Sequence, residues 1–246
     1  MDFKLTAEQL ELQKVARDFA QKELTALADE MEESANPVPK DVLKKIGELG
    51  FLGINTPTEY GGLGLSNLDA IIVLEEFGKI SSAVGWPVFE ANAGPVKVIE
   101  HFGSDALKKR VIPKVCKGEM VVAVSMSEPN AGTGLTDLKT KAEIKGDKIV
   151  INGTKRWCSG AGHSDGYVVY ARMSDAPAAK GIGAVFVDID TPRCIDINKN
   201  STNTFCSRSI RHSGINYITI RMTGAGTPSF GSIDYDFVSF DFSFGF

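Results

Sequence analysis

The stretch Val124-Ser-Met-Ser-Glu-Pro-Asn-Ala-Gly-Thr133 marks the point at which the character of the chain changes. Upstream, apolar residues recur with a helical period; from Val121 onward they alternate with polar residues and are often β-branched, which indicates strands. The residues after Met126 are small or polar, so we expect a strand that runs into a loop. Such a loop presents backbone N–H groups and hydroxyls to a phosphate or a polar ring edge. Its other interpretation is a plain connection between elements.

Upstream of this stretch, residues 1–118 are predicted to form an all-α N-terminal domain. Thr6 and Gln9 make a capping-box pattern at the start of one long amphipathic helix that reaches Met31. Residues 57–64 are too rich in Gly and Pro for the interior of an element and predict a shaped loop. The other helices are expected over 42–49, 66–77, 81–102 (buried, and bent near Gly94-Pro95) and 105–116.

Downstream, residues 119–192 are predicted to form a small antiparallel, β-barrel-like domain. A hairpin turn is expected at 145–148, and Asn152-Gly153 is a further turn signal. No strand alternates with a helix of ordinary length, which disfavours a doubly wound nucleotide-binding fold. The predicted fold class is therefore α+β, an all-α domain followed by a β domain. Its strands are expected over 139–144, 149–155, 167–171 and 182–187.

Residues 193–246 differ in composition from everything before them. They contain no Leu and no Glu, yet they hold seven of the 14 Phe residues of the chain. Leu and Glu are among the commonest residues of globular domains, so their joint absence is a compositional break. We interpret this segment as a divergent tail, with the alternative that its alternating Phe residues form a strand that completes the β domain.

Composition and charge exclude several classes of function. The formal net charge of −4 and the lack of clustered Lys and Arg disfavour nucleic-acid binding. No apolar stretch reaches the roughly 18 residues that cross a bilayer, so no membrane association is expected. The opening residues resemble neither a secretory signal nor a transit peptide. Four cysteines without metal-like or disulfide-framework spacing fit a reduced, cytoplasmic protein.

A second motif, Ile151-Asn-Gly-Thr-Lys-Arg-Trp-Cys-Ser159, follows the first at a suggestive distance. Together, Ser127–Gly134 and Asn152–Gly160 resemble the two motifs of the flavin-binding middle domain of the acyl-CoA dehydrogenase family. Three residues of the first motif depart from the family pattern, namely Asn130, Thr133 and Gly134. Supporting similarities extend the resemblance over about residues 1–192, and they occur near residues 3–9, 57–64, 113–119 and 187–192.

The resemblance implies an FAD site built from both motifs. Ser127 would meet the pyrimidine edge of the flavin, Trp157 would pack on its rings, and Ser159 would bond near N5 and O4. Thr133 would contact the CoA portion of an acyl-CoA substrate, although the departures leave these contacts open. The implied cofactor-binding set is Val124, Met126, Ser127, Thr133, Trp157, Cys158 and Ser159.

Each of these residues also has a structural interpretation that carries no function. Trp157 would then be a buried core aromatic, and Ser159 would be a turn hydroxyl. Cys158 is expected to be an inert strand cysteine rather than a nucleophile. Other candidates are assigned no role: the histidines lack metal-like spacing, and the helical carboxylates are expected to be solvated. These are His101, His163, Glu75, Glu76 and Glu90.

The activity that the resemblance implies is α,β-dehydrogenation of an acyl-CoA thioester by FAD. Family members take the α-proton with a Glu from a C-terminal helical domain, and this sequence does not show such a domain. No catalytic residue is therefore assigned, and the chain is interpreted as truncated and inactive alone. A homo-oligomer and an electron-transferring flavoprotein partner are implied as well. Two alternatives stay open: a non-enzymatic remnant or partner subunit, and a flavin monooxygenase or reductase on the same fold.

Overall fold

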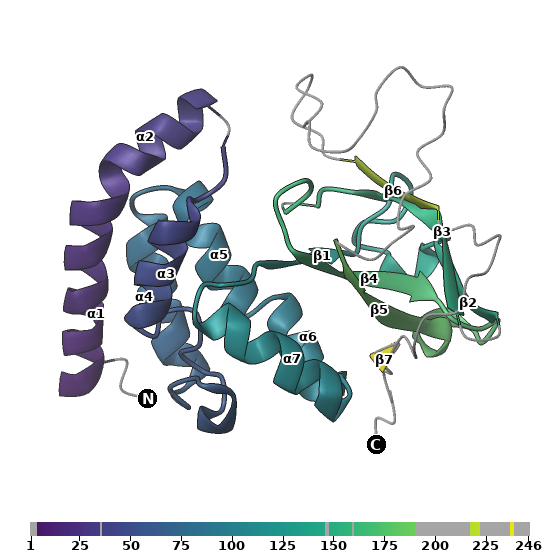
Figure 1. Ribbon diagram of the computed structural model, residues 1–246, viewed down its shortest axis with the longest axis horizontal. Helices are drawn as coiled ribbons and strands as arrows, with labels where there is room; N and C mark the ends of the chain where they lie inside the picture. The colour runs from purple at the N-terminus through teal and green to yellow at the C-terminus, as the bar shows by residue number, and fades with distance from the viewer. Residues whose placement is uncertain are drawn as a thin grey trace, which may run out of the picture. The chain divides into compact units, whose positions relative to one another are not determined.

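The computed structural model describes residues 4–34, 36–145, 148–158 and 160–189, together with strands at 217–221 and 237–238. The chain divides into two compact units. We call Met1–Lys97 with Lys108–Val121 the helical unit, and Val98–Leu107 with Val122–Phe246 the sheet unit. Figure 1 shows the helices of the first and the strands of the second.

The helical part follows the predicted order of elements. One long helix opens the chain, but a π-helical turn interrupts it, so it is divided into three pieces. The predicted bend near Gly94 is a break between two helices, which Ala93 and Gly94 separate. The elements are α1 (Ala7–Phe19), the π turn η1 (Ala20–Leu24), α2 (Thr25–Ser34), α3 (Lys40–Glu48), the 3-10 turn η2 (Thr58–Tyr60), α4 (Asn67–Gly78), α5 (Ser82–Asn92), α6 (Pro95–Phe102) and α7 (Asp105–Cys116).

The start of α1 is fixed by the capping box that the sequence predicts. The Gln9 backbone N–H donates to Thr6 Oγ1 at 3.2 Å, and the Thr6 N–H donates to Gln9 Oε1 at 3.1 Å. Ser66 and Asp69 form the same reciprocal pair at the start of α4. Both boxes satisfy N–H groups that a helix leaves without partners in its first turn.

Three phenylalanines form the centre of the helical unit. Phe19 stacks on Phe77 with ring centroids 5.9 Å apart, and Phe51 meets both rings edge-on. Asn92 is buried beside them, where its side-chain oxygen accepts from the Ile54 N–H at 2.8 Å. Aromatic packing and a satisfied buried amide both favour a single arrangement of these helices.

The interpretation of the helical carboxylates as solvated is wrong for two of the three. Glu76 and Glu90 are buried, at 2% and 4% exposure. The Glu76 carboxylate accepts two hydrogen bonds from the Arg17 guanidinium, each at 3.0 Å, and one from Lys79 at 2.8 Å. The bidentate contact with Arg17 ties α1 to α4, because paired donors compensate the loss of water around the carboxylate.

The sheet unit contains one mixed sheet. Its strands run in the order β6-β3-β2-β4-β5-β7, and β1 pairs with β4 outside this path. The expected antiparallel pairing holds for most neighbours, but β1 and β2 both run parallel to β4. Among the described strands the sheet is open, so it is not a closed barrel. The strands are β1 (Val122–Ser125), β2 (Lys141–Lys145), β3 (Lys148–Arg156), β4 (Gly166–Arg172), β5 (Ile182–Asp188), β6 (Tyr217–Arg221) and β7 (Phe237–Val238).

The strand β3 corrects one expectation about turns. Strands β2 and β3 form the predicted hairpin with Lys145 opposite Lys148, but Asn152-Gly153 is no turn. Both residues lie inside β3, where Gly153 faces the neighbouring segment so closely that a Cβ would lie 2.6 Å from Thr140 Cα. Close approach of another backbone is a common reason for Gly within a strand.

The core of the sheet unit consists of one tyrosine, Tyr167, and of small and β-branched side chains from β1 to β5, namely Ala123, Ala142, Ile149, Ile151, Val169, Ala171 and Val185. Strand β6 pairs with β3 and strand β7 pairs with β5. Two segments from the compositionally distinct tail therefore extend the sheet. In the part of the chain that the structure describes, no helix combines the length and the apolar character needed to cross a membrane.

Candidate functional site

The first motif leaves the sheet through a tight turn. After β1 ends at Ser125, the Glu128 N–H donates to the Ala131 carbonyl at 2.8 Å, and the Ala131 N–H donates back to Glu128 at 3.2 Å. Pro129 and Asn130 occupy the central positions of this turn. Farther along, the Arg172 guanidinium donates to the Thr136 carbonyl at 2.6 Å. The polar loop is therefore fixed at both of its ends.

The second motif meets the first by direct hydrogen bonding. The Arg156 N–H, at the end of β3, donates to the Ser127 carbonyl at 2.8 Å. The Lys155 ammonium donates to the Met126 carbonyl at 3.0 Å. The two stretches that the family resemblance links thus lie side by side, and Ser127 is adjacent to the segment that carries Trp157.

A buried ion pair joins the same two motifs. The Lys155 Nζ lies 2.9 Å from Glu128 Oε1, and the two side chains are 1% and 7% exposed. Glu128 also accepts the backbone N–H groups of Lys139, at 2.7 Å, and Thr140, at 2.9 Å. Charges buried to this degree occur only where they are paired and hydrogen-bonded, and this pair meets both conditions.

The protonation of this pair follows from its surroundings. Burial acts to raise the pKa of Glu128, but the hydrogen bonds that it accepts outweigh burial and hold the pKa below its ordinary value. Burial lowers the pKa of Lys155, and the neighbouring Glu128 carboxylate opposes that shift. The carboxylate and the ammonium therefore stabilise each other's charged form.

Trp157 has an unusual backbone conformation and an exposed side chain. Its φ is +61°, in the left-handed region that residues other than Gly seldom adopt. Its side chain is 57% exposed, so its interpretation as a buried core aromatic is wrong. The Arg156 guanidinium lies 4.4 Å from the indole centroid. A bulky residue held in this region indicates strain that its surroundings impose, which is common at functional sites.

The segment after Trp157 is held by the sheet. Cys158 is buried, and burial raises the pKa of its thiol, as expected for an inert cysteine. The Tyr167 hydroxyl donates to the Gly160 carbonyl at 2.8 Å and accepts from the Gly162 N–H at 3.1 Å. A Cβ at Gly160 would overlap both Ser164 and Ala123. The chain on either side of residue 159 is therefore fixed.

The structure places the predicted site residues at different depths. Val124, Met126 and Ser127 are half-buried at the end of β1, and Thr133 is exposed in the loop. Ser159 lies outside the described residues. In the part of the chain that the structure describes, no group of three or more side chains is arranged to hold a metal ion.

The sequence analysis missed Glu128 and Lys155, although both lie within the quoted motifs. A signal for Lys155 was present. Alternate residues of a strand face the same side, and Lys155 is in phase with the core residues Ile149 and Ile151. A lysine at a core-facing position requires a buried partner, and Glu128 in the adjacent motif is an acidic residue close enough to provide it.

The chain thus combines a helical unit with a mixed sheet, and its two polar motifs are hydrogen-bonded to each other next to the exposed Trp157 at the end of β3. The family model of the acyl-CoA dehydrogenase N-terminal domain matches residues 6–119, and that of the middle domain matches residues 123–216. The chain belongs to the acyl-CoA dehydrogenase family. The second match continues past Pro192, where the sequence analysis ends the resemblance.

Named relatives span several activities. The chain is 35% identical to an isovaleryl-CoA dehydrogenase of Pongo abelii over 76% of this chain and 45% of the relative. It is also 35% identical to a 3-sulfinopropanoyl-CoA desulfinase of Advenella mimigardefordensis, over 76% and 46%. The solved glutaryl-CoA dehydrogenase in complex with glutaryl-CoA superposes with a TM-score of 0.74 at 34% identity, over 79% of this chain and 50% of that one. The chain thus spans about half the length of the relatives that it matches.

Proposed function

We propose that this chain binds FAD and an acyl-CoA thioester and forms the helical and flavin-binding parts of an acyl-CoA dehydrogenase. The observation that carries the proposal is the junction of the two motifs, where the Arg156 N–H bonds to the Ser127 carbonyl and Trp157 stands exposed beside it. Family membership supports the same assignment.

The residues present fit a flavin. A tricyclic ring needs a flat apolar partner and hydrogen-bonding groups at its polar edge. The exposed indole of Trp157 offers the first, and the half-buried Ser127 with the adjacent backbone offers the second. The Arg156 guanidinium lies over the indole, and Trp157 is still 57% exposed, so part of its ring surface is open to a ligand. When bound, FAD would supply the acceptor for a hydride from the substrate.

Individual roles within this proposal rest on chemistry. Ser127 would bond the pyrimidine edge of the flavin, Trp157 would pack on its rings, and Thr133 would contact the CoA portion of the substrate. Ser159, Val124, Met126 and Cys158 complete the proposed set. None of the described residues is proposed as the catalytic base.

Several wider assignments stay predictions. They include an electron-transferring flavoprotein as electron acceptor, a homo-oligomer, location in the cytoplasm and the domain limits at residues 118 and 192. That the chain is inactive alone is also a prediction. The interpretation of residues 193–246 as a replacement for a family-like continuation is wrong for residues 193–216, which the middle-domain model matches, and stays a prediction for residues 217–246. Resequencing the encoding locus tests it, because a frame that restores a family-like continuation would support the idea.

The proposal is tested by the visible absorption spectrum of the purified chain after incubation with FAD and desalting. Retained flavin bands are expected. Trp157→Ala should abolish them, whereas Trp86→Phe, at the other tryptophan of the chain, should not. A folded chain that elutes without flavin would overturn the proposal.

The flavin-loaded chain then separates the chemical alternatives. Bleaching of the flavin by acyl-CoA without oxygen indicates dehydrogenation and would overturn the prediction that the chain is inactive alone. An oxygenated product formed by the reduced flavin with oxygen indicates a monooxygenase, and transfer of its electrons to an organic acceptor without oxygen indicates a reductase. Binding to a full-length relative, measured by size, would instead indicate a partner subunit. The desulfinase among the relatives makes the bleaching assay necessary, since one fold supports several reactions.

A further inference from the structure

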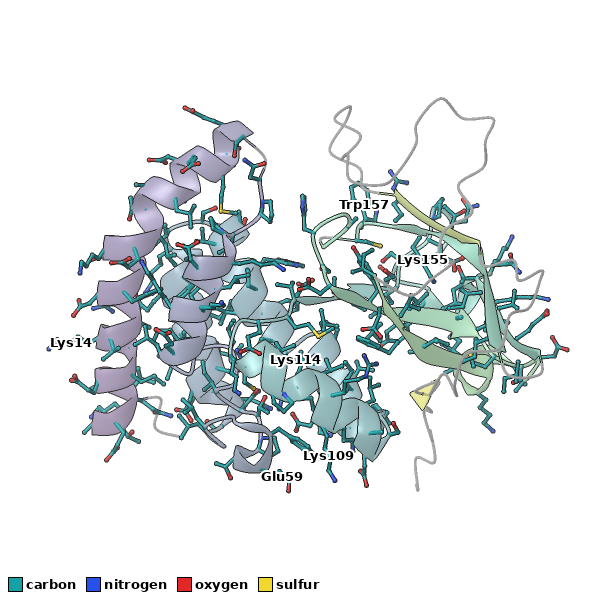
Figure 2. All side chains as sticks on the ribbon, viewed as in Figure 1. Lys14, Glu59, Lys109, Lys114, Lys155 and Trp157 are labelled. Carbon is teal, nitrogen blue, oxygen red and sulfur yellow. The ribbon has the colours of Figure 1, made fainter. Side chains whose placement is uncertain are left out.

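The Glu128–Lys155 pair has a geometry that a mere core contact does not need. Lys155 does not simply neutralise Glu128, because its ammonium also donates to the Met126 carbonyl at 3.0 Å. One side chain on β3 therefore holds two consecutive parts of the first motif, the backbone before Ser127 and the carboxylate after it. Figure 2 shows Lys155 within the sheet unit and Trp157 at its periphery.

The carboxylate of Glu128 is anchored in turn. Its two oxygens accept the N–H groups of Lys139 and Thr140, which begin the segment leading into β2. Glu128 therefore bonds three separate stretches of chain: the turn that it starts, the entry to β2 and the end of β3. A group with these connections fixes the position of each stretch relative to the others.

The backbone conformation of Trp157 depends on this arrangement, because Lys155 and Arg156 directly precede it in the chain. Its φ of +61° is sustained only if the chain before and after Trp157 is held. Before it, Lys155 and Arg156 bond to Met126 and Ser127; after it, Cys158 is buried. The side chain itself is largely exposed, so its own packing does not hold the conformation.

We propose that Glu128 and Lys155 are positioning residues, which lock the Ser127 and Trp157 segments together and so set the orientation of the Trp157 ring. The proposal rests on the function proposed above, because the ring is the surface on which we place the flavin. Neither residue is expected to touch the flavin. Their removal should loosen Trp157 in the absence of any ligand and weaken flavin binding as a consequence.

The test uses the full-length chain carrying Trp86→Phe, which leaves Trp157 as the sole tryptophan. Lys155→Met is compared with Arg17→Met, a matched control that removes a cation from the buried Glu76 of the helical unit. The readouts are the near-ultraviolet circular dichroism and fluorescence anisotropy of Trp157 without FAD, and then the dissociation constant for FAD. Both variants are compared under conditions in which urea denaturation shows each chain to be fully folded, so that a general loss of stability does not enter the readouts.

The expected result is that Lys155→Met lowers the dichroism and anisotropy of Trp157. It should also weaken FAD binding by up to about tenfold, because binding must then immobilise a Trp157 side chain that the parent chain already holds in place. Arg17→Met should leave both signals unchanged. A folded Lys155→Met chain with the parent Trp157 signals, or an equal change in Arg17→Met, would overturn the proposal.

Lys155→Met alone leaves a buried carboxylate, so a second variant covers the case in which it does not fold. Glu128→Gln with Lys155→Met removes both charges but still lacks the donor to the Met126 carbonyl. A loosened Trp157 in this folded double variant supports positioning; a parent-like Trp157, or failure to fold, counts against it. If Trp157 loosens but even the parent chain binds no FAD, the proposed function falls and the positioning stands.

Discussion

In each unit of this protein a glutamate is buried beside a cation, and the two pairs Glu76–Arg17 and Glu128–Lys155 are built differently. In the helical unit Glu76 is buried, but its partners Arg17 and Lys79 are 44% and 50% exposed along their side chains. In the sheet unit both Glu128 and Lys155 are buried. If Glu76 is removed, Arg17 and Lys79 can be hydrated by solvent. If Glu128 is removed, the buried Lys155 ammonium cannot. Loss of the carboxylate should therefore lower the free energy of unfolding less in the helical unit than in the sheet unit.

The largest expected effect is on the sheet pair. Glu128→Ala leaves the Lys155 ammonium buried without its carboxylate and removes the acceptor of two backbone N–H groups. Breaking a buried pair from one side typically lowers the free energy of unfolding by about 3–5 kcal/mol. Urea denaturation followed by circular dichroism measures the change. A loss as small as that of an exposed ion pair would show that water reaches Lys155.

The next effect concerns the close approach of β3 to the segment before β2. Gly153→Ala places a methyl group 2.6 Å from Thr140 Cα, a backbone contact that no rotamer relieves. Overpacking of this kind lowers the free energy of unfolding by about 1–3 kcal/mol. Gly78→Ala is the matched control in the helical unit, because a Cβ there has no neighbour within 4 Å. In thermal melts, the melting temperatures of the two variants should change in different directions or by clearly different amounts.

A smaller effect is expected for the helical pair. Glu76→Gln keeps the shape of the side chain and part of its hydrogen bonding, while Arg17 and Lys79 regain water. The expected loss in the free energy of unfolding is about 1 kcal/mol, the order of one net hydrogen bond. The same urea titration measures it. A loss equal to that of Glu128→Ala would remove the distinction between the two pairs.

The smallest effect is on the dependence of stability on pH. A carboxyl whose pKa is lower in the folded chain stabilises the fold above its unfolded pKa of about 4.3, and this contribution is lost as pH falls through the folded value. Because hydrogen bonds lower the pKa of both Glu128 and Glu76, stability should decrease below about pH 4. The stability of the Glu128→Gln or Glu76→Gln variant should decrease less steeply as pH falls. Unfolding free energies measured on both sides of this pH provide the check.

Much of the helical unit follows from local signals. The capping box at Thr6 is found as predicted, because it is complete within four residues of sequence. The box that Ser66 forms with Asp69 is equally local, although it was not predicted. The burial of Glu76 was not predictable in that way. It depends on Arg17, which lies 59 residues earlier in the chain, and the pattern of α4 alone does not reveal that partner.

In the sheet unit, contacts between distant residues outweigh local sequence signals. Asn152-Gly153 has strong turn propensity, yet pairing with β2 and β6 on either side keeps it extended. The resemblance of the two motifs to a single family site indicated correctly that residues near 127 and 157 lie together. The bonds that join them were not evident, since they involve a lysine and a glutamate that pattern alone assigns to solvent. Side-chain phase within β3 was the one local clue.

The pairing of β3 with β6 has a consequence for the order of events during synthesis. The helical unit is complete once residue 121 has left the ribosome, whereas β3 acquires its outer neighbour only when residues 217–221 emerge. Because domains fold as their residues become available, the helical unit should be compact while β3 still presents unpaired backbone groups. During that interval the unpaired edge of β3 can pair with another chain, and chaperone binding would prevent this.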